Sequence, residues 1–146
     1  MKAAKALSLC NCFAVRQAAR HITKLYERHL AGAKLTTAQF SILVALREEG
    51  SMTMAGLAKA MVMDRTTLLR AIKPMQRDSL LKSNASTDDP RQLVFSLSVA
   101  GERTLKQAMP LWAKAQKEFE IAIGTSEAAQ LRSSLLALAA AADSRP

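Results

Sequence analysis

The residue types best suited to contacting a polyanion lie in one short segment in the middle of the chain. This segment combines three cationic and two hydroxyl side chains, Arg65, Thr66, Thr67, Arg70 and Lys73. An arginine can bind guanine through two parallel hydrogen bonds, and a threonine can contact a thymine methyl group or a phosphate. Helical steps of about 100° place Thr66, Arg70, Lys73 and Arg77 on one face. The opposite face carries an apolar stripe of Leu68, Ala71, Ile72 and Met75. The segment is typical of a helix that reads the major groove of DNA, although a solvated amphipathic helix has the same pattern.

A second cationic candidate, Arg91, follows a segment with strong turn chemistry. Residues 87–90, Thr-Asp-Asp-Pro, separate two short segments at 80–84 and 93–98, which we predict to be the strands of a β-hairpin. An arginine at a hairpin tip suits the narrow, electronegative minor groove of DNA, and Asp89 could orient its guanidinium through an ion pair. A loop arginine alone is common, but beside a cationic helix it favours a winged helix-turn-helix.

Cys10 and Cys12 are the candidates for redox chemistry. We expect both on the first helix, where side chains two positions apart point about 160° away from each other, so a disulfide between them is not expected. Cys12 falls near the apolar stripe of that helix and is the candidate sensor. Simple packing of a buried cysteine is the competing interpretation.

The other reactive side chains do not form a catalytic or metal-binding pattern. His21 and His29 lie eight positions apart and, even with Cys12, lack the paired spacing of metal ligands, so we expect structural or solvated histidines. No Gly-rich phosphate loop and no Ser/His/Asp order occurs, so neither an enzyme nor a cofactor is predicted. Two rivals to DNA binding stay open, a protein-binding helical module and a winged helix that binds RNA.

Composition favours one intracellular domain. The chain has 146 residues, of which 49% are apolar, and its formal net charge is +9. Two cysteines are too few for a disulfide-stapled secreted scaffold. Residues 1–15 weakly resemble a signal peptide, but Asn11 interrupts the apolar run and no small-residue cleavage site follows. No run approaches the roughly 18 apolar residues of a membrane span, so we expect a cytoplasmic location.

The elements that must position these side chains are mostly helical. Apolar periodicity predicts a loose tail over 1–7 and helices over about 8–30, 36–48, 54–61, 64–78 and 98–123, with a last helix after residues 124–126. Thr36 or Thr37, Asp64 and Ser98 are the expected N-terminal caps. The predicted fold class is mainly α with a small β-hairpin wing.

Four short motifs follow one another along the chain: Thr36 with Gln39, Met-Asp-Arg-Thr-Thr-Leu at 63–68, Asp-Pro-Arg at 89–91, and Leu97-Ser98 followed by Gly101. In this order and spacing they resemble the MarR family of bacterial regulators. They correspond to its second helix, the start of its recognition helix, its wing and the entry to its fifth helix. Two departures are Ser79, where the family usually has Gly before a Leu, and Ser98 in place of the commoner threonine.

The resemblance implies a single domain over residues 1–146 with winged helix-turn-helix architecture. Its DNA-binding lobe would span about 36–98, and its dimerisation helices about 8–30 and 99–142. It implies a homodimer whose two lobes bind a near-palindromic operator in double-stranded DNA. The residues expected to contact DNA are Thr36, Arg65, Thr66, Thr67, Arg70, Lys73 and Arg91.

The resemblance also bears on what signal the protein senses. Residues 12–15, Cys-Phe-Ala-Val, are similar to the start of the first helix in the organic-hydroperoxide-sensing branch, where a cysteine is oxidised near tyrosines. Tyr26 matches one of those tyrosines, whereas Thr37 stands at the position of the other. We therefore predict a repressor released by a small aromatic or anionic effector, bound between the dimerisation and DNA-binding regions. Redox sensing through Cys12 and Tyr26 is the alternative.

Overall fold

The computed structural model describes residues 3–143 and is mainly helical, with one small sheet. Its elements in chain order are α1 Ala3–Ser8, α2 Asn11–Leu30, the 3-10 turn Ala31–Ala33, α3 Thr37–Glu49, β1 Met52–Thr53, α4 Met54–Met61, α5 Arg65–Arg77, β2 Leu81–Ala85, β3 Leu93–Leu97, α6 Val99–Ile123 and α7 Thr125–Asp143. This architecture confirms the predicted fold class. Within this described range, no helix is both long and apolar enough to cross a membrane.

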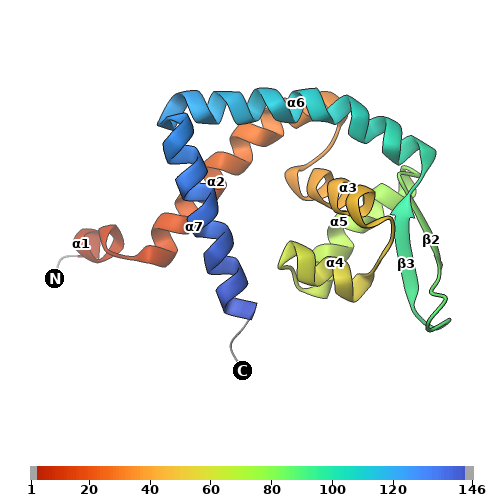
Figure 1. Ribbon diagram of the computed structural model, residues 1–146. Coiled ribbons are helices and arrows are strands. Elements are labelled where there is room, and N and C mark those ends of the chain that lie inside the picture. The colour runs from red at the N-terminus through yellow and green to blue at the C-terminus, as the bar shows by residue number, and fades with distance from the viewer. Residues whose placement is uncertain (1–2, 144–146) are drawn as a thin grey trace.

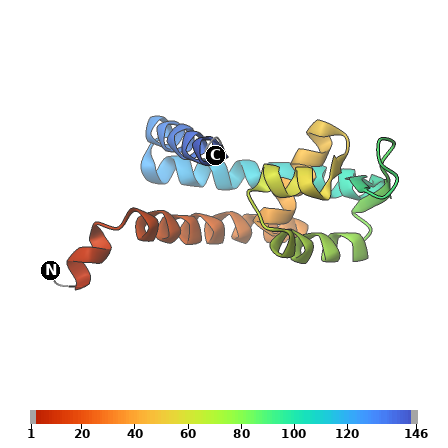
Figure 2. The same cartoon turned by 90° about the horizontal axis from the view of Figure 1, so that it is seen from below.

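The molecule has two parts, arranged at opposite ends of the long helix α6 (Figure 1). The winged lobe, residues 37–97, lies at the N-terminal end of α6. At the C-terminal end of α6, α7 turns back from it, and α2 packs against α6. We call α2, α6 and α7 the helical scaffold; the view from below shows that its far end extends well beyond the lobe (Figure 2).

The N-terminal prediction was partly wrong. Residues 1 and 2 of the expected tail lie outside the described residues, and Ala3–Ser8 forms the short helix α1. The expected single helix over 8–30 begins only at Asn11, because Cys10 has an extended backbone (φ −86°, ψ 109°). The Sγ of Cys10 accepts a hydrogen bond from the Phe13 amide at 3.4 Å and so caps α2. The helical geometry that we expected to separate Cys10 from Cys12 therefore does not apply to this pair.

The sheet has three strands, and one of them was not predicted. Its order is β1-β3-β2, and both pairs of neighbouring strands are antiparallel. Phe95 of β3 stands opposite Met52 on one side and Ser83 on the other. The two-residue strand β1 is too short to show an alternating pattern, so only its pairing with the hairpin defines it.

Capping residues fix where the helices of the lobe begin. Thr36 and Gln39 form a reciprocal capping box at α3, with N–H···O distances of 3.2 Å and 3.1 Å. Asp64 caps α5 by accepting the Thr67 amide at 2.8 Å. Between α4 and α5, Val62 takes a left-handed conformation (φ 52°) that turns the chain from one helix to the next. The predicted helix-turn-helix and its caps are confirmed.

The motif at residues 97–101 joins the wing to α6. The Ser98 hydroxyl caps α6 by accepting the Gly101 amide at 2.9 Å, and it donates to the Ser79 carbonyl at 2.6 Å. A Cβ on Gly101 would lie 2.2 Å from the Leu80 carbonyl oxygen, so this close contact requires glycine. The start of α6 is thus pinned to the chain that leaves α5, which fixes the hairpin relative to that helix.

Candidate nucleic-acid interface

Helix α5 turns its cationic face to solvent. Leu68, Ile72 and Met75 are fully buried, which confirms the predicted inward stripe. The predicted outward residues Arg65, Thr66, Thr67, Arg70 and Lys73 are all exposed. Three apolar anchors at helical spacing therefore fix the rotation of α5 and present its first two turns to a ligand.

One of the predicted contact residues has its hydroxyl group already occupied. Thr67 donates its hydroxyl to Asp64 Oδ2 at 3.0 Å, in addition to the backbone cap at Oδ1. These two hydrogen bonds, the backbone one first, lower the pKa of Asp64, with a smaller contribution from the charge of Arg70. Thr67 thus stabilises the start of α5 through its hydroxyl and exposes its methyl group.

The other exposed side chains of this face are available for binding. Among the described residues, Arg65, Thr66, Arg70 and Lys73 form no side-chain hydrogen bond or ion pair. The last cation on the helix differs, because Arg77 Nε lies 3.0 Å from Asp78 Oδ1. This ion pair neutralises the C-terminal end of the face, so the free positive charge is concentrated at residues 65–73.

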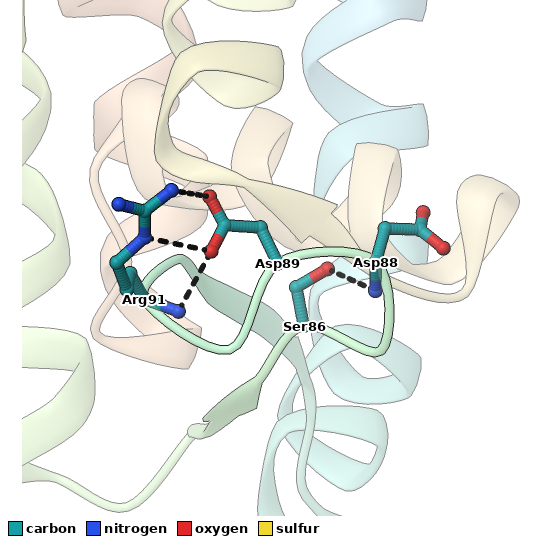
Figure 3. A network of polar contacts seen from close by, with 4 residues as sticks. All are labelled: Ser86, Asp88, Asp89 and Arg91. Carbon is teal, nitrogen blue, oxygen red and sulfur yellow. Dashed lines mark hydrogen bonds and ion pairs between the residues drawn. The ribbon is translucent and has the colours of Figure 1, made fainter.

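The wing loop holds Arg91 in a defined position (Figure 3). Asp89 Oδ1 accepts from the Arg91 backbone amide at 3.1 Å and from its Nε at 3.2 Å. These contacts confirm the predicted ion pair; the side-chain bond, followed by the backbone one, lowers the pKa of Asp89. The Arg91 side chain is nevertheless 90% exposed. The loop therefore orients the guanidinium without burying it.

The lobe brings Arg91 close to the beginning of α5, as expected for a wing beside a recognition helix, and the two segments share a hollow that the sequence did not predict. Arg65 and Arg91 both line a hollow of about 310 Å³, together with Thr53 of β1, Met54 of α4 and Phe95 of β3. Two guanidinium groups thus line one hollow: that of Arg65, and that of Arg91, whose charge is partly neutralised by Asp89. Thr36 does not line this hollow: it caps α3, with an exposed side chain whose oxygen accepts the Gln39 amide.

The two residues of the redox hypothesis do not meet within one chain. Cys12 is exposed near the start of α2, and Tyr26 lies fourteen residues later on the same helix, or roughly 21 Å at 1.5 Å per residue. The Tyr26 hydroxyl donates to the Gln116 side chain of α6. Burial, and then the charge of Glu120, raise the pKa of Tyr26, while Arg132 opposes this effect.

An ion-pair cluster joins α2 to α6. Glu118 accepts from His29 Nε2 at 2.6 Å and also binds Arg28. Both hydrogen bonds, that from His29 first, lower the pKa of Glu118. His29 thus has a structural role, one of the two interpretations predicted for it. Across residues 3–143, no group of three or more His, Cys, Asp or Glu side chains could hold a metal ion.

Comparison with known proteins places this geometry among transcriptional regulators. A family model described as MarR family matches residues 35–93. The transcriptional regulator MosR of M. tuberculosis, solved in complex with DNA, is 33% identical; the match covers 92% of this chain and 96% of MosR, with a TM-score of 0.79.

Two curated relatives are more distant. The repressor NicR of Pseudomonas putida is 25% identical over 116 residues, which is 80% of this chain and 72% of NicR. The organic hydroperoxide resistance transcriptional regulator of Bacillus subtilis is 26% identical over 100 residues, 68% of each chain.

Proposed function

The chain belongs to the MarR family of DNA-binding transcriptional regulators, and we propose that it is a sequence-specific repressor that a small-molecule effector releases from DNA. It acts as a regulator and not as an enzyme. Its location is the cytoplasm, where its DNA ligand lies. One functional domain comprises a DNA-binding lobe over about 36–98 and dimerisation helices over about 8–30 and 99–142.

The observation that carries this proposal is the convergence of Arg91 with the exposed face of α5. The first turns of α5 enter the major groove, where Arg65 and Arg70 read base edges. Thr66 and the Thr67 methyl contact bases or phosphates, and Lys73 and Thr36 contact the backbone. Arg91, held by Asp89, enters the adjacent minor groove.

Duplex binding at several salt concentrations tests the proposal. We expect fluorescence anisotropy to show preferential binding to double-stranded DNA over double-stranded RNA of the same sequence. Neutralising six or more phosphates would lower the affinity by about 10³-fold between 50 and 200 mM salt. Equal affinity for the two duplexes, or an affinity that does not change with salt concentration, would contradict the proposed function.

The helical scaffold supports a homodimer as the active form. Its surface exposes apolar side chains on every helix, among them Val15, Ile121, Leu131, Leu135, Leu136 and Leu138. Helices α2, α6 and α7 also line a largely apolar hollow of about 260 Å³. A second copy of the chain would cover this surface and place two recognition helices one duplex turn apart, ~34 Å. Such a dimer matches a near-palindromic operator.

Redox control through Cys12, supported by Tyr26, is the second candidate. Both cysteines are free and exposed, and the Bacillus relative is named for resistance to organic hydroperoxides. Attack of a thiolate on the O–O bond of a hydroperoxide would give a sulfenic acid and release an alcohol. Because Cys10 caps α2 and Cys12 lies in its first turn, modification of either would perturb the start of the helix.

Single variants distinguish the two thiols. Cys12→Ser should keep its DNA affinity but lose release by an organic hydroperoxide, whereas Cys10→Ser should respond as the parent does. If only Cys10→Ser loses the response to hydroperoxide, Cys10, which caps α2, is the sensor instead of Cys12. If the parent protein holds its operator under millimolar hydroperoxide, the redox candidate is wrong and the small-molecule effector remains.

A further inference from the structure

Two methionines flank the turn of the helix-turn-helix. Met61 is the last residue of α4, Met63 precedes the Asp64 cap of α5, and Val62 lies between the two methionines. Four of the seven methionines of the chain fall within residues 52–63, so thioethers are concentrated around α4. A methionine sulfur can be oxidised reversibly to a sulfoxide, which changes an apolar side chain into a polar one. The packing of this pair therefore decides whether oxidation would affect the turn.

The turn between the two helices has a strained backbone. Val62 has φ 52° and ψ 47°, a left-handed conformation that a β-branched residue rarely adopts. Its side chain is 77% exposed and therefore contributes little packing to hold this conformation. Two backbone hydrogen bonds close the turn, from Val62 N to the Lys59 carbonyl at 3.1 Å and from Met63 N to the Ala58 carbonyl at 2.9 Å. A strained conformation of this kind persists only where neighbouring contacts stabilise it.

The flanking methionines supply such contacts. Both side chains pack against the core of the lobe, which includes Leu57 of α4 and Leu68 of α5, the two helices that the turn joins. Met61 also lines a hollow of about 430 Å³ together with Phe40. Neither methionine is fully buried, so both combine apolar packing with access from solvent. A small oxidant can therefore reach the side chains whose packing holds the turn.

From this placement we infer that Met61 and Met63 form an oxidation site through which hypochlorous acid loosens the start of α5. Each thioether gains one oxygen atom and becomes a sulfoxide. The sulfur loses two electrons, the chlorine of hypochlorous acid gains them, and chloride and one proton are released. A sulfoxide packed against apolar side chains without a hydrogen-bond donor is unfavourable, so the oxidised side chain moves toward solvent. The strained turn at Val62 then loses the packing on both of its sides.

This site differs from redox control through Cys12 in its chemistry and in its place in the fold. The thiol must ionise to a thiolate before it reacts, whereas a thioether has no proton to lose. Cys12 lies on α2 of the helical scaffold, and the methionine pair lies within the winged lobe. The consequence for DNA binding rests on the proposed function, since α5 is the helix proposed to read the major groove.

Amide hydrogen exchange, measured on a chain whose two cysteines are replaced by serine, tests the inference without DNA. A small molar excess of hypochlorous acid should add one oxygen to Met61 and to Met63, seen by peptide mass spectrometry. Met75, which is 1% exposed, should remain unmodified under the same conditions. Exchange over residues 62–70 should become about tenfold faster or more, since local opening becomes easier. Methionine sulfoxide reductases A and B, added together, should restore the original rate.

Matched double variants identify the responsible sulfur atoms. Met61→Leu with Met63→Leu keeps apolar side chains of similar volume and removes both sulfurs, so exchange at the turn should no longer respond to the oxidant. Met52→Leu with Met109→Leu changes two other partly buried methionines that pack against the same core, and should respond as the cysteine-free chain does. A full response in the first variant, or a lost response in the second, would overturn the inference. Oxidation of Met61 and Met63 without faster exchange would also overturn it.

DNA binding is measured separately, by fluorescence anisotropy with a labelled mixed-sequence duplex. Oxidation should lower the affinity of the cysteine-free chain at least about fivefold and leave that of the Met61→Leu, Met63→Leu variant unchanged. Unchanged affinity of the oxidised cysteine-free chain would contradict control of DNA binding by this site. A chain that shows the exchange response but binds no duplex before oxidation would contradict the proposed function and support the oxidation site.

Discussion

The winged lobe and the far end of the helical scaffold differ in how far their apolar side chains are buried. In the lobe, Ile42, Leu43, Leu57 and Leu68 are 0% exposed. On α7, by contrast, Leu136 and Leu138 are 65% and 61% exposed. The first region buries its apolar side chains within one chain, whereas the second leaves them at the surface.

Because of this difference, the position of side chains within a lobe and the spacing between two lobes depend on different parts of the molecule. The position of the side chains proposed to contact DNA depends on a core within one chain, to which the N-terminal half of α6 contributes Leu105 and Ala108. The spacing of two such lobes depends on surfaces that only a partner can cover. Chemistry and geometry of recognition are therefore set by different parts of the molecule, and they should respond to different mutations.

The largest expected effect is loss of the core of the lobe. Leu68→Ala should lower the free energy of unfolding by about 3–5 kcal/mol, since it leaves a cavity under α5. Urea unfolding measures this change. Leu138→Ala removes the same atoms from an exposed site. Its effect on the free energy of unfolding should therefore be small at protein concentrations below the dissociation constant of the dimer. Similar losses of unfolding free energy for the two variants at low protein concentration would contradict this difference between the lobe and α7.

The next effect concerns assembly. Leu135→Glu places a charge on the apolar row of α7 and should weaken the dimer by on the order of 2 kcal/mol, because the carboxylate would be desolvated without a partner. Sedimentation velocity should show monomer at concentrations where the parent is dimeric. Ser133→Glu, about half a helical turn away on the same exposed helix, is the control. A parent protein that stays monomeric at micromolar concentration would contradict the dimer.

A third prediction distinguishes the two proposed DNA contacts of the lobe, α5 and the wing. Arg70→Ala should cost about 1–3 kcal/mol of binding and relax the preference for one base. Arg91→Ala should weaken binding to all operators more evenly and flatten the salt dependence, since the proposed role of this exposed wing residue is to sense groove shape and charge. Binding isotherms on matched and single-base-altered duplexes separate the two. Unchanged isotherms for both variants would contradict the docking.

The smallest expected effect concerns backbone strain at the end of α5. Ser79 follows α5 with φ 57°, a left-handed conformation that favours glycine. Ser79→Gly should raise the free energy of unfolding by about 0.5 kcal/mol, because relief of this strain exceeds the added freedom of the unfolded chain. Ser83→Gly in β2, where the backbone is extended, should destabilise the protein instead. Loss of stability in both variants would show that Ser79 is not strained.

Sequence predicted best what is decided locally. Thr36, Asp64 and Ser98 cap helices in the structure as expected, because a cap needs only the backbone of the next three residues. The buried stripe of α5 was likewise predicted, since helical periodicity alone defines it. Even the ion pair between Asp89 and Arg91 depends on a two-residue separation.

What sequence did not predict depends on packing between distant segments. Strand β1 exists only through its pairing with β3, and the hollow shared by Arg65 and Arg91 exists only once the hairpin packs beside α5. The departure at Ser79 was visible, but its positive φ was not. At the N-terminus the break at Cys10 was missed because the helical pattern there is continuous and the cap is a weak thiol acceptor.

Selection of bound sequences from a pool of random double-stranded DNA is the most direct test of sequence-specific DNA recognition by a symmetric dimer. We expect enrichment of a two-fold symmetric consensus, with half-sites centred about one helical turn (~34 Å) apart. Such a consensus would establish DNA reading by α5 and the symmetry of the dimer in one measurement. A pool without enrichment, or an asymmetric site that a monomer occupies, would contradict it.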